Sequence, residues 1–371
     1  MTFFVTGATG TIGSAVVARL VRDTSEGIVA LVRDASTEAA LARLETAVKA
    51  LDPTIEPLLA GRIQVALGDS ERPRFGLDAR DYAMLVKRGT HIIHTAGAVR
   101  MNLPIEKARS SAVGAAKNVL ALARDPAASV EKIDIVSTVG VAGRDITLLR
   151  EDWVGARHAF HNTYEQAKAE AEDEIRHAVQ DGLPITVHRP SMVVGDSRTG
   201  RTSQFQVFYH LVAFLSGRRT LGVFPAMGQA ELDLVPVDHV AGAIVRASLT
   251  PSTCGAIMHL CAGPRDAIRL IDLQDYIRRA AGAVGRHLPK PRYLSRRLFH
   301  SIVAGLRCVV DARTRSALGT LPVFLDYLDT NQRFENVRTR RWLADQQMDV
   351  PRIADYLPRV LAFYFASNAS R

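Results

Sequence analysis

The sequence predicts an α/β fold built on a doubly wound parallel sheet, with a smaller, mostly helical region at the C-terminal end. Short β-rich apolar runs alternate with segments of helical periodicity, an order typical of parallel strands joined by right-handed helical crossovers. The first apolar run also ends in a glycine-rich turn that leads directly into a helical pattern. Together these observations indicate a Rossmann-like domain over residues 1–262, followed by a helical region over residues 263–371.

Six apolar runs account for the expected strands. They are FFVTG at 3–7, GIVALVR at 27–33, RIQVALGD at 62–69, HIIHTAG at 91–97, KIDIVST at 132–138 and PITVHRP at 184–190. The region after Gly263 lacks this alternation, so we expect helices and polar loops there.

The stretch VTGATGTIG, residues 5–13, predicts a dinucleotide site. In a turn from strand to helix, Gly7 permits a tight turn, Gly10 lets the backbone approach a pyrophosphate, and Gly13 allows close helix packing. The helix N-terminus then faces the phosphates. Glycines at this spacing also occur in ordinary loops, so the rest of the chain has to support the site. The residues expected to contact the cofactor here are Thr6, Gly7, Thr9, Gly10, Thr11, Ile12 and Gly13.

The chain of 371 residues has a net charge of +9 that is concentrated near the C-terminus. Residues 271–371 carry 17 Lys and Arg against 9 Asp and Glu, which leaves residues 1–270 with a net charge of only +1. The segment 286–316 holds eight basic residues and one acidic residue, and therefore indicates an anionic partner or surface. It contains neither a recognised nucleic-acid-binding motif nor interleaved aromatic residues, so we expect no nucleic-acid partner.

The sequence disfavours a membrane-spanning or secreted protein and a metal-binding protein. No apolar run approaches the ~20 residues that span a bilayer, and a strand that starts at residue 2 or 3 leaves no room for a signal peptide, so we expect a cytoplasmic protein. The three cysteines, Cys254, Cys261 and Cys308, form no CxxC pair and have no metal-like spacing. We therefore expect reduced thiols and no metal site.

Two further segments carry side chains suited to proton transfer. The run KIDIVSTVGVAG places Ser137 and Thr138 at the C-terminal end of a strand, the edge at which ligands bind in such sheets. The segment NTYEQAK places Tyr164 and Lys168 four residues apart on one helix face. Such a pair alone is more often a solvated helix face, but a nearby ammonium is what lets a tyrosine, with its pKa near ~10, work at neutral pH. We interpret Tyr164 as a proton donor or acceptor, and Thr138 as a hydroxyl that holds a substrate oxygen while a nicotinamide carries a hydride.

The chain resembles the extended short-chain dehydrogenase/reductases from residue 3 to about residue 260. Seven motifs occur in the family's order: TGATGTIG at 6–13, VALGDSERPRFGL at 65–77, IIHTAGAV at 92–99, IVSTVGVAG at 135–143, NTYEQAK at 162–168, HRPSMVVGDSRTG at 188–200 and LVPVDHVAGAIV at 234–245. Within the family it looks most like the male-sterility NAD-binding branch, which contains thioester reductase domains, fatty acyl-CoA reductases and the terminal domains of carboxylic acid reductases. That closer likeness rests mainly on GDSRTG at 195–200 and PVDHV at 236–240.

The resemblance implies a role for each matching catalytic residue. Tyr164 is the proton donor, and Lys168 is its partner and a ligand of the cofactor ribose. Thr138 is the oxygen-binding hydroxyl because it lies five residues before Gly143, as in the family, and Ser137 is the alternative.

Ser111 departs from the family pattern. It stands three residues before Gly114, where relatives often carry Asn, and it either keeps a water relay to Lys168 or weakens it. The resemblance also implies further cofactor contacts: Asp69 near the adenine, His94, Thr95, Ala96 and Gly97 along the cofactor, and Pro190, Ser191 and Val193 near the nicotinamide.

The end of the second strand predicts NADPH rather than NADH. The run GIVALVRD places Arg33 where an NAD enzyme usually carries an acid for the ribose 2′-hydroxyl, and a guanidinium can pair with a 2′-phosphate instead. The neighbouring Asp34 is the residue that argues for NADH.

Four other polar residues carry weaker signals. His188 lies in an apolar run and is expected to be a hydrogen-bonded core residue, and Asp233 is expected to serve a turn or cap. Arg198 and Arg201 are either solvated loop charges or contacts to a phosphate on the substrate.

These observations predict an NADPH-dependent reductase that converts an acyl thioester, attached to coenzyme A or to an acyl or peptidyl carrier protein, to an aldehyde. Onward reduction to the alcohol, the acyl chain and the oligomeric state are left open. One alternative is another activity of the same superfamily, such as a sugar-nucleotide epimerase, a dehydratase or a hydroxysteroid-type dehydrogenase. The other is a non-catalytic NAD(P)-binding regulatory protein. Only the reductase releases a free thiol.

The basic segment predicts where an anionic donor docks. Residues 292–310, RYLSRRLFHSIVAGLRCVV, have a basic start followed by an apolar run too short to cross a bilayer. We expect Arg292, Arg296 and Arg297 to meet the phosphates of coenzyme A or the acidic face of a carrier protein, with the apolar run lining an acyl pocket. A core helix with solvated arginines and a peripheral contact with an anionic membrane are the alternatives.

Overall fold

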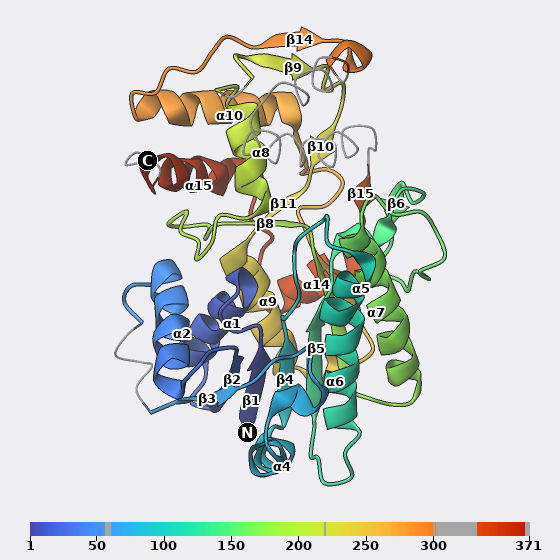
Figure 1. Cartoon of the computed structure of the whole chain (residues 1–371). Helices are drawn as coiled ribbons and strands as arrows, with labels where there is room; N and C mark the ends of the chain where they lie inside the picture. The colour runs from blue at the N-terminus through green and yellow to red at the C-terminus, as the bar shows by residue number, and fades with distance from the viewer. Residues whose placement is uncertain (56–60, 219, 300, 302–331, 368–371) are drawn as a thin grey trace.

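A parallel sheet forms the centre of the structure, a computed structural model that describes residues 1–55, 61–218, 220–299, 301 and 332–367. Its seven strands follow the order β12-β7-β5-β4-β1-β2-β3 (Figure 1). They are β1 (Thr2–Thr6), β2 (Gly27–Val32), β3 (Ile63–Leu67), β4 (His91–His94), β5 (Lys132–Val136), β7 (Ile185–Pro190) and β12 (Ile257–Leu260). All six predicted strands are present, which confirms the Rossmann-like fold class. The seventh strand, β12, was not among the predicted runs.

The chain reverses direction across the sheet between β1 and β4. It runs outward from β1 to β3 and then returns to β4 on the other side of β1. In doubly wound sheets, ligands bind outside the carboxyl ends of the strands at such a switch point.

Helices cover both faces of the sheet. One face carries α1 (Thr11–Asp23), α2 (Thr37–Leu51) and α9 (Val237–Ser248), whose apolar side chains share one core cluster. The opposite face carries α4 (Ala79–Arg88), α6 (Ala115–Ala123) and α7 (Thr163–Gln180) (Figure 1). The short helix α5 (Ile105–Arg109) continues through a π-turn at Ser110–Gly114 into α6.

Side-chain caps define where three of these helices begin. Ser36 accepts a hydrogen bond from Ala39 N at the start of α2 (3.2 Å), and Asn162 accepts one from Glu165 N at the start of α7 (3.0 Å). Asp78 caps α4 in the same way. Each cap satisfies a backbone donor that the first turn of a helix leaves unpaired.

A smaller unit lies beyond the carboxyl edge of the sheet (Figure 1). It contains α8 (Val207–Leu215), α10 (Leu270–Ala283) and α15 (Ile353–Ser367), which pack in a second core cluster. Short strand pairs accompany them: β8 (Met192–Val194) with β11 (Leu234–Pro236), β9 (Val223–Pro225) with β14 (Arg292–Leu294), and β10 (Glu231–Leu232) with β13 (Ile268–Arg269). The second cluster takes residues from 194–234 as well as from beyond 262, so the division of the chain at residue 262 stays a prediction.

The C-terminal part of the chain also returns to the sheet. The strand β15 (Arg333–Phe334) pairs with β6 (Leu148–Leu149), and α14 (Val337–Asp345) contributes Leu343 to the first core cluster. The buried carboxylate of Glu151 accepts hydrogen bonds from Arg338 N (2.7 Å) and Thr339 N (2.8 Å). An acidic side chain from the loop after β6 thus caps α14 and holds it at the sheet.

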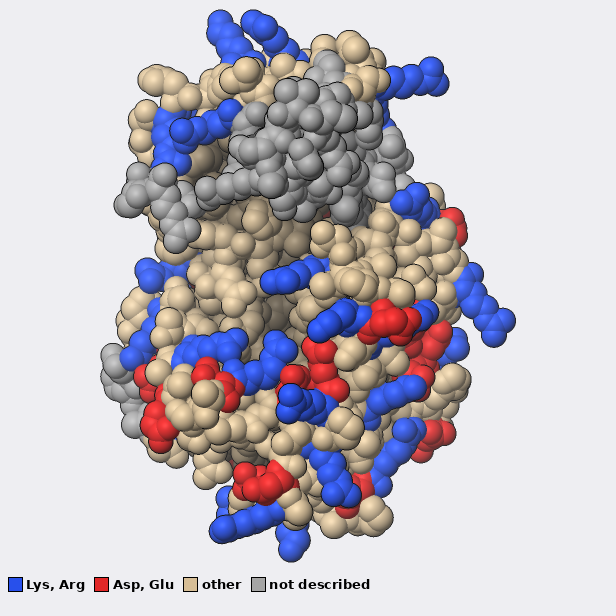
Figure 2. All heavy atoms as spheres, in the orientation of Figure 1, with Lys and Arg blue, Asp and Glu red and all other residues tan. Residues whose placement is uncertain are grey.

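Basic side chains gather at one end of the molecule. Figure 2 shows Lys and Arg projecting at the top, around β9 and β14, whereas both signs of charge intermix over the sheet domain. Of the predicted basic segment 286–316, residues 300 and 302–316 lie outside the described residues, and so does the apolar run from Ile302 to Val310.

Two further expectations concern the membrane and the cysteines. Within the described ranges, no helix is both long and apolar enough to cross a membrane. Cys254 is exposed and Cys261 is buried, and both are free thiols. Cys308 lies outside the described residues.

Candidate active site

The glycine-rich turn between β1 and α1 is so tightly packed that only glycine fits at two of its positions. Gly7 has a φ of +70°, and a Cβ built on it would lie 2.6 Å from the nitrogen of Ala96 in the loop after β4. A Cβ on Gly13 would lie 2.1 Å from the carbonyl oxygen of Gly7. Gly10 N closes the turn by donating to Gly7 O (2.9 Å). These are the close approaches that a dinucleotide turn requires.

The N-terminus of α1 is open to an anion. Unlike α2, α4 and α7, it has no side-chain cap at its N-cap residue Gly10, and its first turn carries no acidic residue. The hydroxyl of Thr11 is buried there and has no hydrogen-bond partner among the described residues. Free N–H groups and the positive end of the helix dipole favour a phosphate at this place. The turn therefore fits the pyrophosphate of a dinucleotide.

Lys168 is buried where the carboxyl ends of β4 and β5 meet. Its Nζ donates to the carbonyl oxygen of Val136, the last residue of β5 (2.9 Å). A Cβ on Gly97, in the loop after β4, would lie 3.2 Å from the same nitrogen. Burial lowers the pKa of Lys168 to about 8, although the carboxylate of Glu172 acts to raise it.

Tyr164 lies one helical turn before Lys168 and beside Thr138. Burial raises the pKa of Tyr164 to about 12, a hydrogen bond with the Thr138 side chain acts to lower it, and the Glu165 carboxylate raises it. Thr138 Oγ1 also accepts a hydrogen bond from Gly140 N (3.0 Å), which fixes its rotamer. Tyr164 is therefore protonated at neutral pH, the state that a proton donor needs.

Ser137 and Ser111 occupy different positions from Thr138. Ser137 Oγ is buried without a hydrogen-bond partner among the described residues and lines a cavity of about 10 Å³ beside Lys168. That volume is near the lower limit for a single water. Ser111 Oγ, in the π-turn, accepts a hydrogen bond from Ala98 N (2.9 Å). Ser111 thus holds the loop that places Gly97 against Lys168, a structural role that the sequence did not indicate.

Arg33 and Asp69 lie together beyond the carboxyl ends of β2 and β3. The Arg33 guanidinium is 65% exposed and lies 3.8 Å from the Asp69 carboxylate and 3.9 Å from that of Glu71. A second guanidinium is close, because Arg43 Nη1 on α2 donates to the carbonyl oxygen of Arg33 (2.8 Å). Asp34 lies 3.8 Å from the Arg43 guanidinium.

The other predicted cofactor residues also follow strand ends. His94 is buried in β4, where its Nδ1 forms a 2.7 Å hydrogen bond with Thr6 Oγ1. Burial and the nearby Lys168 ammonium lower the pKa of His94 to about 3, so the ring is neutral. Thr95 Oγ1 donates to Thr6 O (2.8 Å), so both threonine side chains join β1 to the β4 end. The remaining residues, Pro190, Ser191 and Val193, lie at the end of β7 and in β8.

The two arginines proposed for a substrate phosphate differ in their surroundings. Arg201 Nε donates to the carbonyl oxygen of Ala50 at the end of α2 (2.9 Å), and its guanidinium lies 5.6 Å from the centre of the Phe363 ring on α15. Arg201 therefore links the sheet domain to the smaller unit. Arg198 is exposed in the loop after β8.

The structural roles expected for His188 and Asp233 agree with the structure. His188 is a fully buried core residue whose Nε2 lies 2.7 Å from Asp134 Oδ1. Asp233 accepts hydrogen bonds from the backbone nitrogens of Ala262 and Gly263, both at 2.8 Å, and so supports the turn after β12.

Sequence reasoning missed a buried ion pair behind Lys168. Glu172, one turn further along α7, binds the guanidinium of Arg189 on β7, with Nε 2.9 Å from Oε1. Arg189 is fully buried and also donates to the carbonyl oxygen of Asp152 (3.0 Å) and to His259 Nε2 (3.2 Å). The sequence did contain a signal for this ion pair, because Glu172 stands four residues after Lys168 and so lies on the same face of the helix.

A dinucleotide turn, a hydroxyl at the end of β5 and a Tyr-Lys pair on the next long helix define an NAD(P)-dependent reductase of the extended short-chain dehydrogenase/reductase type. The chain belongs to the male sterility protein family of NAD-binding proteins, whose family model matches residues 5–244.

Two curated relatives illustrate the family. The chain is 28% identical over 278 residues to isonitrile lipopeptide synthase of Streptomyces coeruleorubidus, a match that covers 74% of this chain and 18% of the relative. It is 31% identical over 294 residues to L-2-aminoadipate reductase of Saccharomyces cerevisiae, covering 74% of this chain and 21% of the relative. The chain thus spans about a fifth of the length of either protein.

Two solved structures are similar over almost the whole chain. The terminal R domain of the myxalamid PKS-NRPS biosynthetic pathway superposes with a TM-score of 0.83 at 27% identity, covering 99% of this chain and 91% of that one. A thiolation-reductase di-domain from an archaeal non-ribosomal peptide synthetase superposes with a TM-score of 0.77 at 18% identity, covering 100% and 75%. The second likeness supports the fold alone.

Replacing Tyr164 with Phe should abolish turnover and leave cofactor binding intact. The ring and its packing survive while the proton is lost, and general acid catalysis of this kind contributes ~10² to 10⁴ in rate. Steady-state kinetics and a cofactor titration measure the two effects. Tyr82→Phe, on α4, is the matched control and should behave as wild type. Turnover by Tyr164→Phe within a few-fold of wild type would remove Tyr164 from the chemistry.

The activity should fall as pH rises through about 8. The folded-state pKa of Lys168 is lowered to about 8, so the ammonium is present below that pH and is lost above it. The sequence assigns this ammonium to the support of Tyr164, so we expect kcat/KM to decline on the alkaline side when the ammonium is lost. Lys168→Ala should be slow and lack this decline, whereas the exposed Lys117→Ala should keep it. An alkaline decline that survives in Lys168→Ala would assign it to another group.

Proposed function

We propose that the protein reduces an acyl thioester to an aldehyde with NADPH. The observation that carries the proposal is the position of Tyr164 beside the Thr138 side chain, one helical turn before the buried Lys168, next to a turn that fits a dinucleotide pyrophosphate. The relatives support the type of reaction, because one is named as a reductase of 2-aminoadipate and the structural neighbours are named as reductase domains of peptide and polyketide synthases.

The side chains supply oxygen binding and a proton. Thr138 and Tyr164 hold the thioester carbonyl oxygen, since the Thr138 side chain lies close enough to the Tyr164 phenol to lower its pKa. A bound nicotinamide supplies the hydride to the carbonyl carbon. As negative charge develops on the oxygen, Tyr164 gives it a proton, and Lys168 stabilises the phenolate that remains.

The products follow from the balance of the reaction. Hydride addition and proton transfer convert the thioester to a thiohemiacetal. Breaking its C–S bond and removing the hydroxyl proton then releases an aldehyde and a thiol. Overall, one thioester, one NADPH and one proton give one aldehyde, one thiol and one NADP⁺.

The donor of the thioester is proposed to be a carrier protein. Arg292, in β14, and Arg297, shortly after it in the chain, are exposed. Arg296 lies between them in sequence, and its Nε donates to the carbonyl oxygen of Ala226 (3.1 Å). Positive charge here would speed the encounter with an acidic carrier.

The direct test follows NADPH absorbance and free thiol together, with the same acyl group attached to coenzyme A, to a carrier protein and to N-acetylcysteamine. The proposal expects equal rates of NADPH loss and thiol release with at least one thioester. Thiol release without NADPH oxidation would indicate a hydrolase. Cofactor binding with no turnover of any thioester would overturn the proposal.

NADPH should bind more tightly than NADH, and Arg33→Ala should remove the difference. A guanidinium pairs with the 2′-phosphate through charge-assisted hydrogen bonds, so the variant should lose about tenfold or more in NADPH affinity and little in NADH affinity. Dissociation constants for both cofactors, in wild type and in the control Arg22→Ala, measure this. A preference of the wild-type protein for NADH would contradict the assignment.

A further inference from the structure

A buried carboxylate lies behind Lys168, outside the reach of the reactants. Glu172 is 1% exposed on α7, one helical turn after Lys168. Both side chains line the cavity of about 10 Å³ at the end of β5, which is far too small for a cofactor or a substrate. Glu172 can therefore act on the chemistry only through Lys168.

The guanidinium of Arg189 binds both oxygens of this carboxylate. Arg189 Nε, on β7, donates to Glu172 Oε1 (2.9 Å), and Arg189 Nη2 donates to Oε2. A carboxylate that accepts hydrogen bonds from two nitrogens of one guanidinium is ionised and fixed in orientation. Without such a partner, a glutamate and a lysine four residues apart on a helix can pair directly. Because Arg189 holds Glu172 back, Lys168 Nζ keeps its hydrogen bond to Val136 O (2.9 Å).

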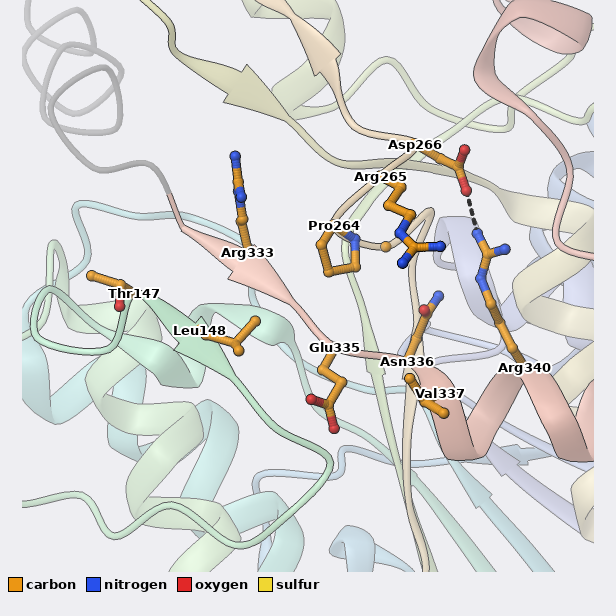
Figure 3. A pocket seen from close by; sticks show the side chains of 11 residues that line it. Thr147, Leu148, Pro264, Arg265, Asp266, Arg333, Glu335, Asn336, Val337 and Arg340 are labelled. Atoms are coloured by element: carbon orange, nitrogen blue, oxygen red, sulfur yellow. Dashed lines mark hydrogen bonds and ion pairs between the residues drawn. The ribbon is translucent and has the colours of Figure 1, made fainter.

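The far side of Arg189 is fixed by the returning C-terminal segment. Arg189 Nη1 donates to Asp152 O (3.0 Å) and to His259 Nε2 (3.2 Å). Burial, together with the charge of Arg189, lowers the pKa of His259 to about 3, so the ring is neutral and has a single N–H. Since Arg189 can only donate, that N–H is on Nδ1 and donates to Glu335 O (2.5 Å), between β15 and α14 (Figure 3). A chain of hydrogen bonds thus runs from this segment to Glu172.

Glu172 supplies the negative charge that acts on the Lys168 ammonium. The other titratable groups beside Lys168 are Tyr164 from α7 and His94 from β4. Burial raises the pKa of Tyr164 to about 12 and lowers that of His94 to about 3, so both are uncharged at pH 7. The other described residues that line the small cavity are apolar, apart from the Ser137 hydroxyl. Burial disfavours the ammonium here, and the carboxylate of Glu172 opposes that effect.

We propose that Glu172, oriented by Arg189, is a positioning residue that keeps Lys168 in its ammonium form inside the fold. The inference rests on the proposed role of Lys168 in thioester reduction, in which the ammonium stabilises the phenolate of Tyr164. Glu172 sets the fraction of the protein that carries this ammonium at a given pH. Removing the carboxylate makes Lys168 lose its proton at a lower pH, because the effect of burial is then unopposed.

The experiment replaces Glu172 with Gln, which keeps the size of the side chain and removes its charge. Two measurements give the pH at which Lys168 loses its proton: the alkaline midpoint of kcat/KM, and an NMR titration of the Cε signal in protein made with isotope-labelled lysine. The signal of Lys168 is the one missing from the Lys168→Ala spectrum. In Glu172→Gln both midpoints should fall by about one pH unit or more from the wild-type value of about 8.

The matched control is Glu170→Gln, two residues earlier on α7. Glu170 forms a comparable ion pair with Arg109 (2.8 Å), but it does not line the cavity beside Lys168. This variant loses a carboxylate and an ion pair from the same helix, so it should keep both wild-type midpoints.

A double variant decides between the charge of Glu172 and the loss of an ion pair. Glu172→Gln alone leaves the guanidinium of Arg189 unpaired inside the protein, whereas Glu172→Gln combined with Arg189→Met removes both buried charges and so protects the fold. The midpoints should still fall in the double variant, but by less, because no unpaired guanidinium repels the ammonium. Wild-type midpoints in the double variant would overturn the proposal, whatever the change in rate.

The NMR titration separates this proposal from the proposed function. It uses the protein without cofactor or substrate, so it tests Glu172 independently of turnover. Failure of wild type to reduce any thioester would overturn the proposed function alone, while a midpoint of Lys168 that does not respond to Glu172 would overturn this inference alone.

Discussion

The site depends on one buried cation, the ammonium of Lys168. A lysine in such a place needs compensation, because burial disfavours its charged form. Val136 O accepts a hydrogen bond from it, and Glu172 provides negative charge one helical turn away, in a carboxylate that Arg189 also binds. A Cβ on Gly97 would lie 3.2 Å from Nζ, a tight contact that the end of the lysine side chain would have to relieve by a few tenths of an ångström. Lys168 thus ties α7 to the end of β5 and lies against the loop after β4.

The same burial sets the protonation states of two side chains in the site. It holds the pKa of Tyr164 near 12 and that of His94 near 3, so the site presents a protonated phenol and a neutral imidazole at pH 7. A protonated tyrosine next to a hydroxyl and an ammonium is ready to give a proton to an oxygen that gains negative charge. This is the arrangement that reduction of a carbonyl compound requires, whereas oxidation of an alcohol needs the phenolate first.

Local sequence signals predicted most of the sheet and the glycine-rich turn after β1. They failed for side chains whose role depends on contacts with residues distant in sequence. The strand runs, Gly7 and Gly13 contact residues close to them in sequence or in one adjacent loop. A local sequence pattern is therefore enough to predict them. Arg201 sits in a polar loop, where the sequence left two interpretations open, a solvated charge and a contact to a substrate phosphate. The fold places the Arg201 guanidinium between Ala50 and Phe363, two residues far from it in sequence, and no local pattern indicated these contacts. The role of Ser111 could not be predicted either. Its hydrogen bond with Ala98 N depends on the π-turn in which Ser111 lies, and no local pattern indicated that turn.

The most direct test of this account is the fate of a deuterium. Wild-type protein is given NADPH deuterated at the transferable position of the nicotinamide, together with a carrier-bound acyl thioester. Mass spectrometry then measures the deuterium in the aldehyde and the free thiol on the carrier. The account predicts one deuterium in the aldehyde group for each carrier thiol released, and loss of both signals in Tyr164→Phe. An aldehyde without deuterium, or a free thiol formed together with a carboxylic acid, would contradict it.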